Sequence, residues 1–458
     1  MKLLAICATS IFLVGLDTTI VNVALPSIGR DLRLGTADLQ WTVDAYTLVL
    51  AALLITSGAL ADRLGRRRIF RLGLVVFGAG SVACALAPTM GVLVAARAVQ
   101  GVGGSMLSPV ALAIVVSVIT DPRERARAIG VWAAVFGLSM AAGPILGGLL
   151  IAGLGWRWVF WANLPVIAIV LVLTARHVPE SRAPKARRLD PLGQILLIVL
   201  VGASVAALIE GPRLGWGSPV LLAGYLVIVA AGVAFARVET RQAEPLIDLR
   251  LFRRPPFAAA AGGAVAVFAA LNVTLLVGTL YLQQVRGLSP VAAGLVTLPM
   301  AIAATVCAPL AGHLVGRVGP RLPLRIAGVG LAVGGLLLIG LDDRTPMPLL
   351  LAAYLFAGIG VGFANAPITN TAVSGLPPER AGVAGGITST ARQFGAALGI
   401  ALAGVLVTLP ADTGHSGGAA TRPGWVLVAI CGVAVLLAAQ VSPTSSPRRH
   451  RPTTALAR

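Results

Sequence analysis

The stretch Gly58-Ala-Leu-Ala-Asp-Arg-Leu-Gly-Arg-Arg-Arg68 places five charged residues between two long apolar runs. By the positive-inside rule, a short loop this rich in arginine lies on the cytoplasmic side of a membrane. Its glycines allow a sharp reversal of the backbone, and its aspartate lies near enough to the arginines to pair with them. The loop is either a topology signal alone or, because of its ordered spacing, also a cytoplasmic gate. The candidate gate residues are Gly58, Asp62, Arg63, Gly65, Arg66 and Arg67.

The composition indicates a membrane protein with many spans. Of 458 residues, 57% are hydrophobic and 12% are charged, and the mean hydropathy is +0.90, which is more apolar than a soluble core requires. The net charge of +19 would indicate a nucleic-acid partner in a soluble protein, but here it gathers in alternate loops. We therefore expect the lipid bilayer as a partner and no nucleic acid. Four isolated cysteines without metal-ligand spacing predict neither a metal nor another cofactor.

Fourteen apolar runs are long enough to cross a bilayer. Loops assigned to the cytoplasm, together with both termini, hold 27 of the 36 Lys and Arg residues, whereas the opposite loops hold seven. This asymmetry predicts that both termini are cytoplasmic. The polar, Pro-rich residues 442–458 predict a disordered tail. The predicted spans are 3–26, 41–61, 70–88, 91–119, 127–152, 158–175, 191–210, 219–237, 257–283, 290–315, 323–341, 347–374, 382–409 and 424–441.

The basic loop has a second copy. Residues 312–321, GHLVGRVGPR, match it at five positions, 254 residues downstream. The pair Gly101 and Gly103 of the fourth span recurs as Gly360 and Gly362, 259 residues downstream. Nearly equal offsets predict an all-α membrane protein made of two related six-helix halves, an arrangement in which transporters place the substrate site between the halves. The predicted division is an N-terminal half at 1–180, a two-helix insert at 181–255 and a C-terminal half at 256–441.

Two charged residues lie deep inside predicted spans, where each costs about 3 kcal/mol or more. At 1.5 Å per residue, Asp17 lies about 21 Å along the first span, and Arg97 lies about 9 Å from the opposite end of the fourth span. In a hydrocarbon core about 30 Å thick, the two depths coincide. We expect the two side chains to form either an ion pair that only fixes packing or a functional site.

Small and polar residues accompany both charges. Thr18 and Asn22 lie close to the aspartate on the helical wheel, and Gln100 and Gly101 follow the arginine at i+3 and i+4. These faces suit a water-filled cavity better than lipid, so the four residues are candidate cavity residues.

Further polar residues are open to more than one interpretation. Arg392 and Gln393 lie within the thirteenth span and are also candidate substrate-cavity residues, where they form either a second polar site or a helix-packing contact. Asp44 and Glu210 are expected near the outer interface, where a charge costs little.

The fifth span carries GLSMAAGPILGG at 137–148. Small residues four apart let helices pack at short distance, and an internal proline invites a bend. The residues concerned are Gly137, Gly143, Pro144, Gly147 and Gly148. They predict a tight helix interface.

Taken together, these stretches resemble the fourteen-span drug:proton antiporters of the major facilitator superfamily. LDTTIVNVALP at 16–26 resembles that family's first-helix motif, GALADRLGRRR at 58–68 its loop motif and RAVQGVGG at 97–104 its helix-4 motif. GLSMAAGPILGG at 137–148 resembles the fifth-helix motif of exporters, and WRWVFWANLP at 156–165 the segment that follows it. The second loop copy departs from the motif, because Gly316 stands where the first copy has its acidic residue.

The resemblance implies export of amphipathic small molecules such as antibiotics, driven by protons as the coupling ion and by no other cofactor. It implies a multi-pass protein of the bacterial plasma (inner) membrane that works as a monomer. Asp17 is then the expected proton carrier, with Arg97 tuning its proton affinity. The alternatives are a symporter or a single-metabolite exporter of the same superfamily, and a membrane sensor or enzyme without transport activity. The last class has no support, since no HExxH or GxSxG motif occurs.

Overall fold

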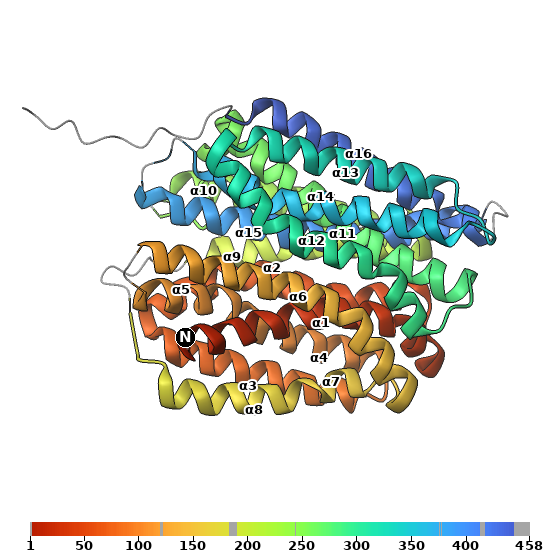
Figure 1. The fold of residues 1–458 in the computed structure, drawn as a ribbon, viewed down its shortest axis with the longest axis horizontal. Coiled ribbons are helices and arrows are strands. Elements are labelled where there is room, and N and C mark those ends of the chain that lie inside the picture. The colour runs from red at the N-terminus through yellow and green to blue at the C-terminus, as the bar shows by residue number, and fades with distance from the viewer. Residues whose placement is uncertain are drawn as a thin grey trace, which may run out of the picture.

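The computed structural model describes residues 2–119, 122–182, 190–242, 244–374, 376, 378–412 and 417–443. Within these ranges every regular element is a helix, and the long helices run side by side in one bundle (Figure 1). The helices are α1 (Lys2–Leu32), α2 (Thr36–Leu64), α3 (Arg66–Ala85), α4 (Met90–Ser105), α5 (Ser108–Val118), α6 (Pro122–Leu154), α7 (Trp158–Trp161), α8 (Asn163–His177), α9 (Pro191–Leu214), α10 (Pro219–Arg241), η1 (Leu249–Arg253), α11 (Pro255–Leu280), η2 (Tyr281–Val285), α12 (Pro290–Val318), α13 (Arg321–Ile339), α14 (Met347–Val373), α15 (Pro378–Asp412), η3 (Gly417–Thr421) and α16 (Arg422–Val441).

Thirteen helical stretches of the described chain are long and apolar enough to cross a membrane. The remaining predicted span, 127–152, falls within α6, whose described apolar run is Ala142–Leu154. The protein is therefore an all-α, multi-pass membrane protein. Most of the predicted tail, from 444 onward, lies outside the described residues.

Three predicted spans differ from the helices in detail. α1 passes through Pro26 and continues to Leu32, because neighbouring helices can satisfy the carbonyl that an internal proline frees. The predicted span 91–119 is divided between α4 and α5, where Pro109 occupies the first turn of α5. The span 158–175 is likewise divided between α7 and α8.

The helices form two groups. In Figure 1, α1–α8 (red to yellow) occupy the lower part of the bundle and α11–α16 (green to blue) the upper part, with α2, α9 and α15 along the boundary. α9 is hydrogen-bonded to α2 at two levels, because Gln194 Nε2 donates to Ala52 O at 2.6 Å and Trp41 Nε1 donates to Glu210 Oε1 at 2.9 Å. Its contact with α15 is apolar. The first helix of the predicted insert is therefore attached to the lower group through polar contacts.

The two copies of the basic loop adopt the same backbone turn. Gly65 lies between α2 and α3 with φ +114°, and Gly319 lies between α12 and α13 with φ +82°. Both values fall in the region that favours glycine. We call the end of the bundle that holds these two turns the basic end, and the opposite end the far end. The equivalent turns agree with an internal repeat.

The repeated glycines of the fourth helix in each group pack against the second and third helices, but the two partners are exchanged between the groups. A Cβ on Gly101 would lie 2.7 Å from Tyr46 O of α2, and one on Gly103 would lie 2.7 Å from Phe77 Cα of α3. In the other group, Gly362 packs against α12 and Gly360 against α13. In both groups, glycine lets the fourth helix approach the second and third closely.

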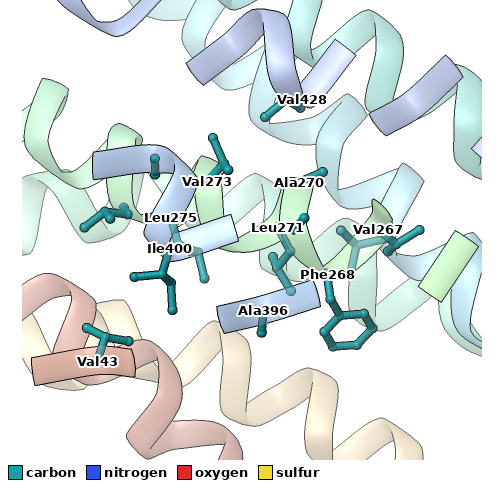
Figure 2. Close-up of a cluster of buried hydrophobic side chains, with 14 of the residues drawn as sticks. Val43, Val267, Phe268, Ala270, Leu271, Val273, Leu275, Ala396, Ile400 and Val428 are labelled. Atoms are coloured by element: carbon teal, nitrogen blue, oxygen red, sulfur yellow. The ribbon is translucent and has the colours of Figure 1, made fainter. Parts of the chain in front are cut away.

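The two groups meet tightly at the far end. Gln40 of α2 donates from Nε2 to the carbonyls of Ile400 and Ala401 in α15, at 2.9 and 2.8 Å. A Cβ on Gly294 of α12 would lie 2.6 Å from Pro144 O of α6. The apolar core beneath this contact includes Val43, which points toward Ile400 in Figure 2.

The described glycines of the same helices are packed less closely at the basic end. A Cβ on Gly58 of α2 or Gly385 of α15 would have no neighbour within 4 Å, and one on Gly386 would lie 4.0 Å from Ile55. The structure is therefore closed at the far end and looser at the basic end.

Candidate functional site

The two charged residues predicted to meet do so inside the lower group. Asp17 of α1 and Arg97 of α4 form an ion pair of 2.6 Å between Oδ2 and Nη1, and neither side chain is exposed. Gln100 donates from Nε2 to Asp17 Oδ1 at 2.8 Å and accepts from Arg97 Nη1 at 2.6 Å. Both carboxylate oxygens are therefore hydrogen-bonded, as a buried ion pair requires.

Arg97 also contacts groups that the sequence pattern does not identify. Its Nε donates to the carbonyl of Thr42 at 3.0 Å, and its guanidinium lies 4.4 Å from the ring centroid of Tyr46 and 5.9 Å from that of Phe160. Nη2 has no hydrogen-bond partner. Because arginine keeps its proton in proteins, Asp17 is the group of this pair that can change its charge.

The neighbours of the ion pair are more enclosed than predicted. Gln100 is fully buried, and Gly101 packs against α2 and lines no opening. Thr18 is half-buried and donates to Val14 O at 2.9 Å. The small-residue face of α4 thus serves close helix packing, which sequence periodicity does not distinguish from a cavity wall.

Asn22, one of these four residues, lines a pocket. Its Nδ2 donates to Thr18 O at 2.8 Å, while its Oδ1 is buried without a partner. The pocket lies between the two groups of helices near the far end, and Gln283 beside it donates to Val23 O at 3.2 Å. The residues lining it are Thr19, Asn22, Val23, Pro144, Leu275, Thr279, Leu282, Gln283, Ala293, Gly294 and Thr297.

Arg392 of α15 is partly buried and points toward α14. It donates from Nη1 to Asn365 Oδ1 at 3.2 Å and from Nη2 to Thr369 Oγ1 at 3.3 Å. Gln393, the next residue, is half-buried and lies seven residues before Ile400 on the side of α15 that meets α2. Neither residue touches the Asp17 pair in this structure.

The basic loop contains an ion pair of its own. Asp62 accepts from Arg66 Nη2 at 2.8 Å and from Arg66 Nε at 3.0 Å. Arg63 is exposed, and Gly65 forms the turn between the two helices. Asp62 is thus paired within its own loop at the basic end that is loose here, and its role as a gate in another conformation stays a prediction.

Glu180, which the sequence analysis did not single out, fastens this loop. It accepts from the backbone N–H of Arg67 at 3.0 Å, and the N–H of Arg66 donates to Ser181 O at 2.9 Å. A Cβ on Gly65 would lie 2.6 Å from Glu180 Oε1. A carboxylate at the start of α3 stabilises the helix dipole. Glu180 lies 113 residues from Arg67 in the chain, so no local pattern announces the contact.

The predicted tight interface of α6 has two sides. A Cβ on Gly143 would overlap Thr19 Oγ1 of α1, and one on Gly147 would lie 2.8 Å from Ile20 Cγ1. On the other side, a Cβ on Gly148 would lie 2.8 Å from Val291 Cα of α12, close to the contact of Pro144 with the same helix. The predicted close packing is confirmed at these positions. Gly137 lies in α6, outside the described side chains.

Asp44 is more enclosed than expected for a charge near the outer interface. Its side chain is fully buried, and neither carboxylate oxygen has a hydrogen-bond partner. It lies one turn after Gln40, on the part of α2 that meets α15. Glu210, by contrast, is near the far end and forms an ion pair of 2.7 Å with Arg213. No three His, Cys, Asp or Glu side chains of the described chain are grouped to hold a metal ion.

Comparison with known proteins places this architecture in a family. The family model of the Major Facilitator Superfamily matches residues 7–400. The multidrug resistance protein Stp of Mycobacterium tuberculosis (strain CDC 1551 / Oshkosh) is 42% identical over 405 residues, which cover 88% of this chain and 75% of that protein. The methylenomycin A resistance protein of Streptomyces coelicolor is 37% identical, over 89% of this chain and 86% of that protein.

A solved structure has the same fold. It is a crystal structure of a bacterial homologue of the human lysosomal transporter Spinster, in an inward-facing, unoccupied conformation. It aligns with a TM-score of 0.66 at 19% identity and covers 96% of this chain and 97% of that one. With the family model spanning most of the residues, the chain belongs to the Major Facilitator Superfamily.

Proposed function

We propose that this protein exports amphipathic small molecules such as antibiotics from the bacterial cytoplasm in exchange for external protons. The observation that carries the proposal is the Asp17–Arg97 ion pair. Its carboxylate is fully buried within the helix bundle, next to an arginine that keeps its proton. The relatives named for multidrug and methylenomycin A resistance support export as the direction of transport. The proton is the only coupling ion proposed, and no cofactor is required.

The ion pair offers a way to couple protonation to movement. A proton on Asp17 would remove the charge that Arg97 pairs with, which weakens the link between α1 and α4. α1 is packed on α6 through Thr19 and Gly143, and α6 in turn contacts α12 of the other half through Pro144 and Gly294. Protonation of Asp17 would thereby loosen the far-end contact between the halves. A ligand or proton shifts such an equilibrium only through a difference between the two states.

The basic end is proposed to face the cytoplasm, with both termini on that side. Its loops contain the arginine clusters that the positive-inside rule assigns there. In this orientation the structure is closed toward the outside. The protein is proposed to act as a monomer in the plasma membrane, since both groups of helices that form the central interface belong to one chain.

The test uses a bacterial host that lacks its own efflux pumps. Cells expressing the wild-type protein should extrude ethidium and survive higher antibiotic concentrations, and collapse of the proton gradient should stop extrusion. Asp17→Asn should insert into the membrane at a comparable level but lose extrusion driven by a pH gradient in proteoliposomes, whereas Asp17→Glu should retain part of it. Undiminished proton-driven extrusion by Asp17→Asn would overturn Asp17 as the coupling site. Uptake in place of efflux would identify a symporter.

A further inference from the structure

Arg392 differs from every other charged side chain at mid-span in the described chain, because it is partly exposed and has no charged partner. Its three hydrogen bonds go to neutral oxygens, namely Asn365 Oδ1 at 3.2 Å, Thr369 Oγ1 at 3.3 Å and Thr388 O at 3.4 Å. No described carboxylate lies within 4.0 Å of it.

Each nitrogen of the guanidinium donates one hydrogen bond, and all three bonds are long. N–H···O bonds of more than about 3.2 Å are weak, whereas a guanidinium bonds a carboxylate at about 2.7 to 2.9 Å. Arg97, whose Nη1 lies 2.6 Å from Asp17 Oδ2, shows the shorter contact that an arginine makes with a carboxylate in the same protein. Charged side chains inside spans usually pair with an opposite charge or with backbone carbonyls, and the described residues around Arg392 supply no carboxylate.

The position of Arg392 gives a molecule from the basic end access to it. Arg392, Ala396 and Ile400 are four residues apart and share one face of α15. At its far-end side this face meets α2, where Ile400 lies opposite Val43 (Figure 2). Arg392 lies two turns closer to the basic end, and its side chain is partly exposed, as are those of Asn365 and Thr369.

We infer that Arg392, together with Asn365 and Thr369, binds the carboxylate of an amphipathic acid that the protein transports. The inference rests on the proposed export function and names its substrate class. A planar guanidinium matches a carboxylate through two parallel hydrogen bonds, and the Thr369 hydroxyl and Asn365 amide can donate to the same oxygens.

The binding test compares an acid with its neutral ester on purified full-length protein. Pyrenebutyrate and its methyl ester are titrated by fluorescence, and the acid should bind wild-type protein at least tenfold more tightly. Arg392→Gln should weaken the acid by roughly 10- to 100-fold, the usual range for a charge-assisted hydrogen bond, and leave the ester unchanged. Arg392→Lys keeps the charge and should retain an intermediate preference. Arg325→Gln, which alters an arginine bound to Gln440 at the basic end, is the matched control and should change neither ligand.

The outcomes separate this inference from the export function. Equal affinity of wild-type protein for acid and ester, or an unchanged acid preference in Arg392→Gln, overturns the carboxylate site even if ethidium efflux is intact. Competition by inorganic phosphate as strong as by pyrenebutyrate would identify a site for small anions and would also overturn it. Loss of acid efflux in cells expressing Arg392→Gln, with acid and ethidium efflux both preserved in Arg325→Gln, is the expected result. If wild-type cells extrude neither compound, the export function fails while the binding result stands by itself.

Discussion

At the scale of single residues, the buried ion pair predicts strong coupling between its two members. Removal of either Asp17 or Arg97 leaves its partner uncompensated in a fully buried site, at a cost of about 3 to 5 kcal/mol. Asp17→Asn and Arg97→Gln should each lower the thermal unfolding midpoint in detergent. The double variant should be more stable than the sum of the two losses implies. Strictly additive losses would show that the two residues do not depend on each other.

Tyr46 supplies the control for this cycle. Its ring lies 4.4 Å from the guanidinium of Arg97, but its hydroxyl has no hydrogen-bond partner. Tyr46→Phe keeps the ring and should therefore leave the unfolding midpoint nearly unchanged. A large loss in this variant would mean that general disturbance of the site, and not charge, governs its stability.

At the scale of helices, α6 is the element whose packing is least tolerant of bulk. Gly143→Leu places a side chain where Thr19 of α1 already lies, and overpacking of this kind costs about 1 to 3 kcal/mol. The loosened interface should admit water, so proteoliposomes with this variant should leak protons in the absence of substrate. Gly153→Leu lies in the same helix with no neighbour within 4 Å and should leave the liposomes tight. Equal leakage from both variants, or from neither, contradicts the interface role of Gly143.

Some features of the helices can be predicted from the sequence, and others cannot. The apolar runs and their charged borders predict the spans well, because a bilayer accepts little else. The meeting of Asp17 with Arg97 follows from depth alone, since a charge in hydrocarbon requires a partner. The enclosure of Asp44 does not follow, because burial within a bundle depends on how helices distant in the sequence pack around α2. The hydrogen bond from the backbone of Arg67 to Glu180 is likewise not predictable, because the two residues lie 113 residues apart in the chain.

At the scale of the whole molecule, the two halves meet along an interface that is tightly packed at the far end and less tightly packed at the basic end. Outer closure depends on contacts such as those of Gln40 with α15 and of Pro144 with Gly294. Alternating access requires these contacts to break and the basic end to close in turn. The loop residue Asp62, which now pairs with Arg66 in its own loop, is then free to find partners across the closed basic end.

Locking the far end should therefore stop transport without unfolding the protein. The Gln40 side chain occupies the space where a Cβ on Gly404 would lie, so cysteines at both positions are close enough for a disulfide. In a background without the four native cysteines, oxidised Gln40→Cys/Gly404→Cys protein should show no ethidium efflux, and reduction should restore it. A Gly385→Cys probe at the basic end should remain open to a water-soluble maleimide in the locked form, because that end is loose when the far end is closed. Each single cysteine variant should pump equally with and without oxidant. If the cross-linked protein pumps at the reduced rate, the far-end seam between α2 and α15 does not open during transport, and the exit path must lie elsewhere.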